Sequence, residues 1–264
     1  MHMTQIVGIA LVRNEDAHLR RVIENVAGFC DRLVIADHRS TDDTPRIIEE
    51  AKGRYPQIES HTIASARESH TLIQKYAGTS TWVFGVDGDE IYDPAGLAEM
   101  RKRLVDGEYD MHWMILGNVL NCDFVDPPER VAKGYLAPPC RSVTKLYNFQ
   151  LIRSWDGDTP ERLHGGRIDF LPGHDASARL NLHEATPWAE SPFRCLHTCF
   201  TARSSLDAAP SVRENIMDVH AAGPLKRLRR WWRMLRGRPV ESDWKYSRYG
   251  RGERVTIDAS PFFP

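Results

Sequence analysis

The chain has 264 residues, 41% of them hydrophobic, which is enough for one large α/β domain or two joined halves. Its formal net charge of -1 indicates no class of partner, and no apolar run approaches the length of a membrane span. The five cysteines lack paired Cys-x-x-Cys spacing, and no charged-then-apolar leader is seen, so we expect a cytoplasmic protein with reduced thiols.

Near-continuous apolar runs predict four buried parallel strands in the first part of the chain. They cover Gln5 to Val12, Arg32 to Ala36, Ile58 to Ile63, and a run from Trp82 to Val86. Helical spacing predicts helices over 18–28 and 66–77, and capping residues before Pro45 predict another. Because strands alternate with helices as in right-handed βαβ units, the carboxyl ends of the strands should share one rim.

Acidic residues stand at this rim, where open α/β sheets bind ligands. Asp37 ends the second strand, and Asp87, Asp89 and Glu90 follow the fourth. Three carboxylates so close together need a neutralising cation, and oxygen ligands suit Mn²⁺ or Mg²⁺ bound together with substrate phosphates. No glycine-rich phosphate loop is present, so a carboxylate-held metal would take its place. The alternative is a solvated acidic turn.

Four stretches in this order and spacing, Leu11 to Glu15, Leu33 to Thr44, Arg67, and Trp82 to Glu90, resemble family 2 glycosyltransferases, which use nucleotide-diphosphate sugars. The resemblance implies the GT-A fold, a Rossmann-like three-layer α/β sandwich with a largely parallel central sheet. It implies a metal held by Asp89 and Asp87, and a nucleotide pocket that includes Arg13, Glu15, Asp37, Arg67 and Asp87. His38 departs from the second acidic residue of many members, which leaves the base and sugar open between UDP- and GDP-linked donors.

Simpler roles exist for several of these residues. Asp37 is also suited to cap the following helix, Arg67 to be an ordinary surface arginine, and Arg13 and Glu15 to pair with each other. We divide the chain into a nucleotide-sugar-binding half (1–118), an acceptor-binding half (119–210) and a C-terminal basic helical segment with its tail (211–264). In the second half we expect a strand over Tyr109 to Leu120, loops over 121–139 and a strand within 141–152.

The stretch from Trp155 to His164 resembles the acceptor-side motif of the same family. Many relatives have His-Glu where this chain has Pro160 and Glu161. Since the family inverts the anomeric centre, the acceptor hydroxyl needs a general base, and the resemblance implies Glu161. Asp158 and the pair His183–Glu184 are rivals, and a loop of ordinary solvated acids is the alternative.

Enzymes of this fold often take a further metal ligand, commonly His, from a segment after the acceptor region. His197, in a predicted late strand, is the candidate, and His174–Asp175 is the runner-up. Lys245 and Arg248 lie in a basic segment that we expect to be flexible, and a lid over the leaving diphosphate is one use for it.

Residues 225–239 carry seven basic side chains, no acid, and leucines and a tryptophan at helical spacing. Such a helix suits the anionic inner face of a membrane, a diphosphate clamp, or docking on the core with its arginines solvated. We expect no nucleic-acid partner.

These features together predict an inverting, metal-dependent glycosyltransferase with a glycan or lipid-linked acceptor, acting in cell-surface polysaccharide biosynthesis. A sugar nucleotidyltransferase is the first alternative, although the Gly-rich basic loop expected after the first strand is missing. A non-catalytic nucleotide-sugar or membrane-surface binding protein is the second.

Overall fold

A computed structural model describes residues 4–207 and 243–264. The strands are β1 Gln5–Val12, β2 Arg32–Asp37, β3 Ile58–Thr62, β4 Thr81–Asp87, β5 Glu90–Tyr92, β6 Met114–Leu116, β7 Asn118–Asp126, β8 Val131–Leu136, β9 Lys145–Asn148, β10 Ile152–Asp156, β11 Arg167–Phe170, β12 Arg179–Asn181, β13 Arg194–His197 and β14 Arg254–Asp258. The helices are α1 Leu19–Ala27, α2 Thr44–Arg54, α3 Glu68–Thr71, α4 Pro94–Val105, α5 Leu182–Ala185 and α8 Asp243–Tyr249, with short 3-10 turns at 74–76, 149–151, 188–190 and 260–262.

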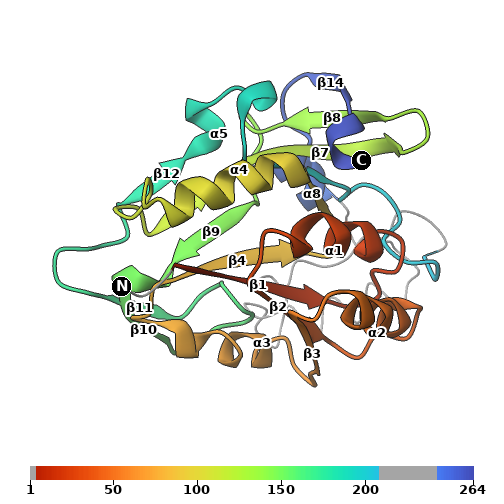
Figure 1. Cartoon of the computed structure of the whole chain (residues 1–264). Helices are drawn as coiled ribbons and strands as arrows, with labels where there is room; N and C mark the ends of the chain where they lie inside the picture. Colours follow the sequence, from red (N-terminus) through yellow and green to blue (C-terminus); the bar gives the residue numbers. More distant parts are fainter. Residues whose placement is uncertain (1–3, 208–242) are drawn as a thin grey trace, which may run out of the picture.

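A seven-stranded sheet forms the centre of the molecule, in the order β12-β6-β9-β4-β1-β2-β3. The pairs β3–β2, β2–β1 and β1–β4 are parallel, and β9 alone runs against its neighbours, so the sheet is largely parallel as predicted. Helices α1, α2 and α4 cover one face, while α3 and the hairpin β10–β11 lie on the other (Figure 1). The layered α/β fold class is therefore confirmed.

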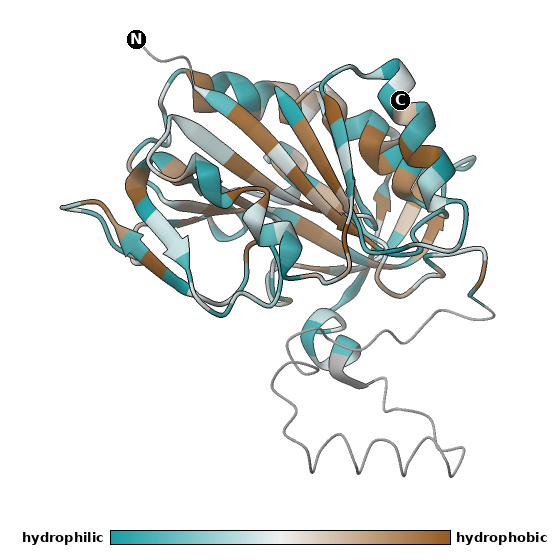
Figure 2. Cartoon of the chain, turned by 90° about the horizontal axis from the view of Figure 1, so that it is seen from below, coloured by the Kyte–Doolittle hydropathy of each residue, from teal (hydrophilic) through white to brown (hydrophobic). Residues whose placement is uncertain are grey.

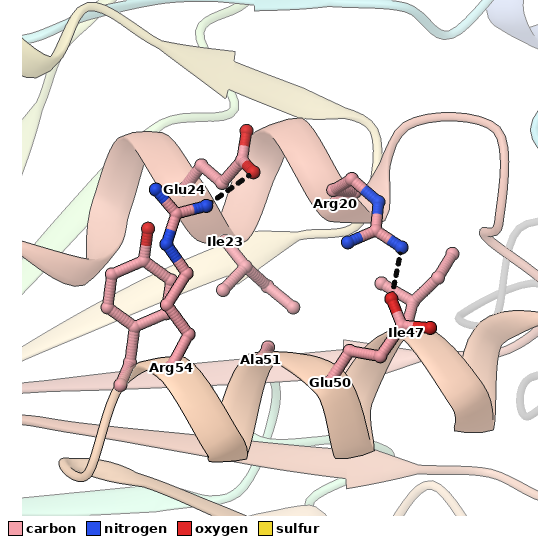
Figure 3. Close-up of a pocket in the computed structure, with 8 residues that line it drawn as sticks. Arg20, Ile23, Glu24, Ile47, Glu50, Ala51 and Arg54 are labelled. Carbon is pink, nitrogen blue, oxygen red and sulfur yellow. Dashed lines mark hydrogen bonds and ion pairs between the residues drawn. The ribbon is translucent and has the colours of Figure 1, made fainter.

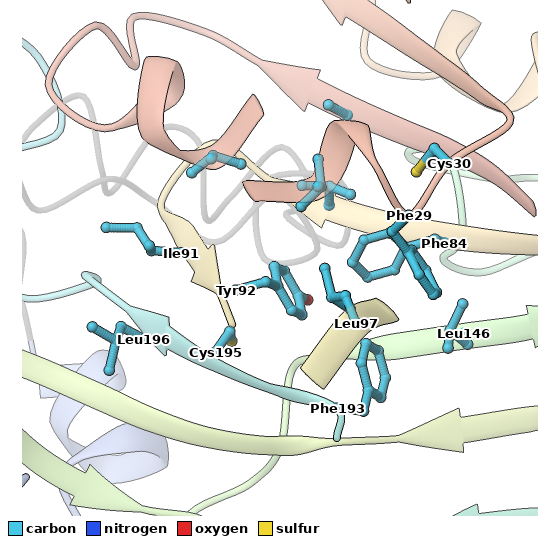
Figure 4. Close-up of a cluster of buried hydrophobic side chains, with 14 of the residues drawn as sticks. Phe29, Cys30, Phe84, Ile91, Tyr92, Leu97, Leu146, Phe193, Cys195 and Leu196 are labelled. Carbon is cyan, nitrogen blue, oxygen red and sulfur yellow. The ribbon is translucent and has the colours of Figure 1, made fainter. Parts of the chain in front are cut away.

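The strands are apolar on both faces because the sheet separates two cores. Ile6, Ile35 and Phe84 belong to the larger core under α1, α2 and α4, whereas Val7 and Val83, one position along, belong to the smaller core. Figure 2 shows apolar residues running along the strands of this sheet. In the larger core, the rings of Phe84 and Tyr92 lie 4.9 Å apart in an edge-to-face pair, close to Phe29 and Phe193 (Figure 4).

A second sheet, β14-β8-β7-β13-β5, corrects two predictions for the second half of the chain. The single strand expected over Tyr109 to Leu120 is broken at Gly117 into β6 and β7, which belong to different sheets. A Cβ on Gly117 would lie 2.4 Å from the Phe193 carbonyl oxygen, so the backbones approach too closely there for a larger residue. The loop-rich stretch expected over 121–139 is largely the hairpin β7–β8, with Pro127 and Pro128 confined to its turn.

The strands and helices of the first half otherwise match their predicted positions closely. The helix expected over 66–77 is the exception, because it forms as α3 and a separate 3-10 turn, Gln74–Tyr76. Beyond the boundary at 118, β9 and β12 return to the central sheet, so both halves of the chain build it.

Candidate active site

Open α/β sheets bind ligands in a crevice at the point where the strand order reverses, and in this sheet that point lies between the ends of β1 and β4. From β1 the chain winds outward to β2 and β3, while β4 lies on the opposite side of β1, which makes their junction a topological switch point. The segments after β1 and β4 meet there: a Cβ on Gly88 would lie 2.8 Å from Glu15 Cγ. Glu15 and Asp89, 74 positions apart in the sequence, are thus gathered at one place, as the sequence predicted.

Asp89 is a deeply buried carboxylate at this place, with only 2% of its surface exposed. Its Oδ2 lies 3.1 Å from Arg203 Nε, and Arg203 also forms two hydrogen bonds to Glu15, at 2.6 and 2.9 Å. Burial alone would raise the pKa of Asp89, but Arg203 and the nearby His197 outweigh it and lower this pKa. The buried Oδ1 of Asp89 has no hydrogen-bond partner among the described residues, so an ionised oxygen there still lacks its counter-group.

His197 ends β13 and faces the same carboxylate, with Nε2 3.7 Å from Asp89 Oδ2. Its other ring nitrogen, Nδ1, lies 2.8 Å from Asn121 Oδ1, which can only accept, so Nδ1 carries the proton in the neutral ring. Burial lowers the pKa of His197 and keeps it neutral. A neutral imidazole whose far nitrogen is fixed by an oxygen acceptor is the usual state of a metal-ligating histidine.

Asp89 and His197 fit a hard divalent cation such as Mn²⁺ or Mg²⁺. Together they offer a partnerless carboxylate oxygen, Oδ1, and a ring nitrogen that lies 3.7 Å from the second oxygen of the same carboxylate. Within 4–207 and 243–264 no group of three or more His, Cys, Asp or Glu side chains is arranged to hold a metal. A cation here would therefore need further oxygens from water or from the phosphates of a bound ligand, which is how Mg²⁺ is usually held.

Asp87 differs from Asp89, because a buried arginine already neutralises it. Arg162 forms an ion pair with Asp87 and is 1% exposed. Burial opposes ionisation of Asp87, but Arg162 and Lys145 outweigh this effect and lower its pKa. Next to it, Glu90 accepts hydrogen bonds from Asp87 N and the Tyr92 hydroxyl, and burial together with Asp87 raises its pKa well above the usual value. Glu90 is therefore a neutral acid beside two ionised ones.

Glu161, the predicted base, lies between the guanidinium of Arg162 and the ring of His164. It is 10% exposed, contacts Arg162 Nη1 at 3.4 Å, and forms a close contact with His164 Nδ1. Although burial favours the neutral acid, Arg162 and His164 lower the pKa of Glu161 to about 2. The second ring nitrogen of His164 lies 3.4 Å from Lys145 Nζ. Glu161 is thus ionised, but so stabilised that it binds a proton only weakly.

The remaining predicted residues of the first half stand at or after the ends of β1, β2 and β3. Asp37 is buried and accepts from the Ser40 backbone N–H and hydroxyl, so it holds its own turn rather than capping α2. Arg67 is exposed and forms an ion pair with Asp158, whose side chain is 79% exposed. Glu15 pairs with Arg203 rather than with Arg13, which is itself exposed on the same segment.

Helix α8, near the end of the chain, packs beside His197 and the segment that follows it. Lys245 Nζ is buried and donates to the Cys199 carbonyl at 2.7 Å, and its charge contributes to lowering the pKa of Asp89. The ring of Tyr249 lies edge-on to His197, with centroids 5.2 Å apart. Lys245 to Tyr249 are helical where a flexible segment was expected; Arg248 is on the exposed side.

The runner-up residues take part in other contacts. Asp175 accepts from Ser177, and His183 lies near the Leu116 carbonyl and Glu184. The predicted basic helix over 225–239 lies outside the described residues. Within the described part, no helix has the length and apolarity that crossing a membrane requires. A small pocket between α1 and α2 is lined by the ion pairs Arg20–Glu50 and Arg54–Glu24 and contains none of the predicted site residues (Figure 3).

The contacts that Asn121, Lys145, Arg162 and Arg203 make in the site could not be predicted from the sequence. Each acts through a partner that is distant in the chain, such as Arg162 with Asp87 or Asn121 with His197. A weak signal exists for Arg162, because it stands beside Glu161 in the acceptor-side motif, and for Arg203, whose basic side chain is suited to bind a phosphate or to cap a following helix.

No family model matches the chain, and no curated protein matches it. Among solved structures, it is similar to the mannosyltransferase PcManGT from Pyrobaculum calidifontis, solved with GDP-Man and Mn²⁺ (16% identity, TM-score 0.41, 75% of this chain and 58% of that one). It is also similar to glucosyl-3-phosphoglycerate synthase from Mycobacterium tuberculosis (18%, 0.38, 56% and 58%). A third is 4-diphosphocytidyl-2C-methyl-D-erythritolsynthase from Anaerococcus prevotii (13%, 0.36, 57% and 72%). Structural similarity at this low identity does not establish the function, so the function is inferred below from the residues of the site.

Proposed function

We propose that this chain is a metal-dependent, inverting glycosyltransferase that takes its sugar from a nucleotide-diphosphate donor. One observation carries the proposal: at the switch point of a largely parallel sheet, a buried, ionised Asp89 keeps one oxygen without a partner and faces a neutral, oriented His197. Two protein ligands do not fill the coordination shell of a divalent cation. Such a pair therefore suits a cation whose remaining ligands are phosphate oxygens of the substrate.

The residues around the crevice divide into a donor side and an acceptor side. Glu15, Asp37, Arg13 and Arg67 follow or flank the strand ends where the nucleotide would bind, and Asp87 continues this wall. A divalent cation bound at Asp89 and His197 would neutralise charge that develops on the departing diphosphate. Lys245 supplies a further positive charge close to Asp89, and we propose Arg248, in the same helix, as a second diphosphate contact.

The acceptor would enter from the side of β10 and the loop at 157–166, where Glu161 and Asp158 lie. An uncharged hydroxyl, from a glycan or a lipid-linked sugar, would attack the anomeric carbon opposite the diphosphate, which inverts its configuration. We further propose that the acceptor is a cell-surface precursor met at the inner membrane face, and that residues 225–239 contribute the membrane contact.

The main alternative is a sugar nucleotidyltransferase, in which the phosphate rather than the sugar is attacked. The residues after β1, Arg13 to Asp16, contain no glycine, whereas a nucleotidyltransferase needs close backbone approach to the triphosphate there. A non-catalytic binding protein is the second alternative, and the ionised Glu161 beside His164 on the acceptor side counts against it.

Incubation of the protein with a panel of UDP- and GDP-hexoses and Mn²⁺ tests the proposal. We expect one donor to release its nucleoside diphosphate and free sugar, with a chelator abolishing the release. Pyrophosphate release from a nucleoside triphosphate and a sugar phosphate would instead establish the nucleotidyltransferase. Donor binding without release of either product would establish the binding protein.

A further inference from the structure

The acceptor side of the crevice contains a chain of four charged or polar groups with a histidine at its open end. Arg162 links Asp87 to Glu161, and Glu161 contacts Nδ1 of His164. The side chains at the two ends are the more exposed, 33% for Asp87 and 37% for His164, while Arg162 and Glu161 between them are 1% and 10% exposed. On the Glu161 side of Arg162 the histidine is therefore the group that an acceptor can reach.

The contacts of His164 determine which ring nitrogen carries its proton. Lys145 Nζ lies 3.4 Å from Nε2, and an ammonium group can only donate, so Nε2 presents its lone pair. Nδ1, in close contact with the Glu161 carboxylate, then carries the hydrogen. The Lys145 contact is longer than the usual 2.7–3.2 Å or so of a good hydrogen bond, so a substrate hydroxyl can compete for Nε2.

The loop that carries His164 is held on several sides. His70 contacts the carbonyl oxygens of Arg162 and Trp155 at 2.6 and 2.7 Å, and Ser69 Oγ accepts from Arg162 N at 2.9 Å. Trp155 Nε1 donates to the Gly165 carbonyl at 2.9 Å. The imidazole is thus fixed by its backbone as well as by Glu161, which is the arrangement that an oriented base requires.

We propose that His164 is the general base for the acceptor hydroxyl, and that Glu161 is a positioning residue that acts through it. This inference rests on the proposed function. In the step, the acceptor oxygen bonds to the anomeric carbon, its proton moves to His164 Nε2, and the bond from that carbon to the diphosphate oxygen breaks. Nucleoside diphosphate leaves, Glu161 stabilises the imidazolium, and the proton then passes to water.

The surrounding charges prepare His164 for this role near neutral pH. Lys145, followed by burial, lowers the pKa of His164, while Glu161 opposes them and Arg162 adds a smaller lowering effect. The ring is therefore neutral, with its lone pair available, at pH 7. Glu161 remains ionised throughout, because its own pKa is about 2.

Two readouts test the assignment, and the first needs no substrate. Nitrogen-15 NMR of the histidine rings, with His164→Gln used to assign the signal, should show a neutral Nδ1–H tautomer for His164 at pH 7. Its pKa should fall further in Glu161→Gln and rise in Lys145→Met. An Nε2–H tautomer, a charged ring at pH 7, or a pKa that neither variant moves would overturn the proposal.

The second readout is Mn²⁺-dependent hydrolysis of the UDP- or GDP-hexose that the protein binds, with water as the acceptor. We expect His164→Gln to lower kcat by about 10²–10⁴-fold without changing the Kd of the donor, and His112→Gln, on the segment before β6, to change neither. An equal rate in His164→Gln would overturn the base assignment alone. A wild type that binds no nucleotide sugar, or that binds a donor and never hydrolyses it, would overturn the proposed function, whatever the state of His164.

Discussion

At the scale of single residues, the two acids of the Asp87-Gly88-Asp89 motif have different environments. Asp87 is saturated by the buried Arg162, whereas Asp89 keeps a partnerless oxygen beside the neutral His197. The sequence does not distinguish these two residues, because both are aspartates in the same short motif. The structure shows which one keeps an oxygen without a partner among the described residues.

A variant at Asn121 tests whether this residue orients His197. Replacing it with Ala removes the acceptor that fixes Nδ1, so the ring loses its preferred tautomer while Asp89 remains intact. We expect Mn²⁺-dependent nucleotide binding to weaken by about 10–100-fold, because second-shell partners of metal ligands have effects of this size. Calorimetric titration measures it, and unchanged affinity would show that His197 is not a ligand.

Arg162 tests the buried charge network. Substitution by Met leaves Asp87 and Glu161 without their shared cation in a buried site, so we expect the free energy of unfolding to fall by about 3–5 kcal/mol. Urea unfolding followed by tryptophan fluorescence measures this change. Arg153→Met, which breaks an exposed pair with Asp169, is the matched control and should cost less than about 1 kcal/mol.

At the scale of elements, the sequence predicted the first half much better than the second. The strands β1 to β4 are short apolar runs bounded by polar residues, so their position depends mainly on local composition. The hairpin β7–β8 was missed because its strands are only partly apolar and are flanked by prolines, and their pairing depends on distant contacts with β13 and β14.

Gly134 shows how one such contact constrains the hairpin. A Cβ at this position in β8 would lie 2.1 Å from the carbonyl oxygen of Asn121 in β7, so the two strands cannot keep their spacing. Gly134→Ala should destabilise the protein by about 1–3 kcal/mol and displace Asn121 from His197. Thermal unfolding measures the first effect. Gly53→Ala in α2 is the control. A Cβ added there would meet no neighbouring atom within 4 Å, so this variant should not destabilise the protein.

The difference between local sequence signals and distant contacts also explains which residues of the site could be predicted. Residues that follow a buried strand, such as Asp37 and Asp89, are visible in the sequence because the fold class brings strand ends together. The contacts of Arg203 and Lys145 are not visible, because a basic residue in a loop or a strand carries no local mark of the side chain that it will meet.

At the scale of the whole molecule, the buried acids make stability depend on pH. Asp87, Asp89 and Glu161 have pKa values below those of the unfolded chain, which are about 4. Their stabilising contribution is fully present above pH 4–5 and is lost as the pH falls toward 2. We expect the free energy of unfolding to decrease over this range, and less so in Glu161→Gln. A flat profile from pH 5 to 2 would contradict these environments.

The central claim is that the crevice between β1 and β4 binds a nucleotide diphosphate through a cation at Asp89. Calorimetric titration with UDP and GDP, in Mn²⁺ and again in chelator, tests it most directly. We predict that one nucleotide binds, that chelator removes the binding, and that Asp89→Asn abolishes it while the surface variant Asp43→Asn does not. The claim would be contradicted if neither nucleotide binds, or if the affinity is the same in chelator and in the Asp89→Asn variant.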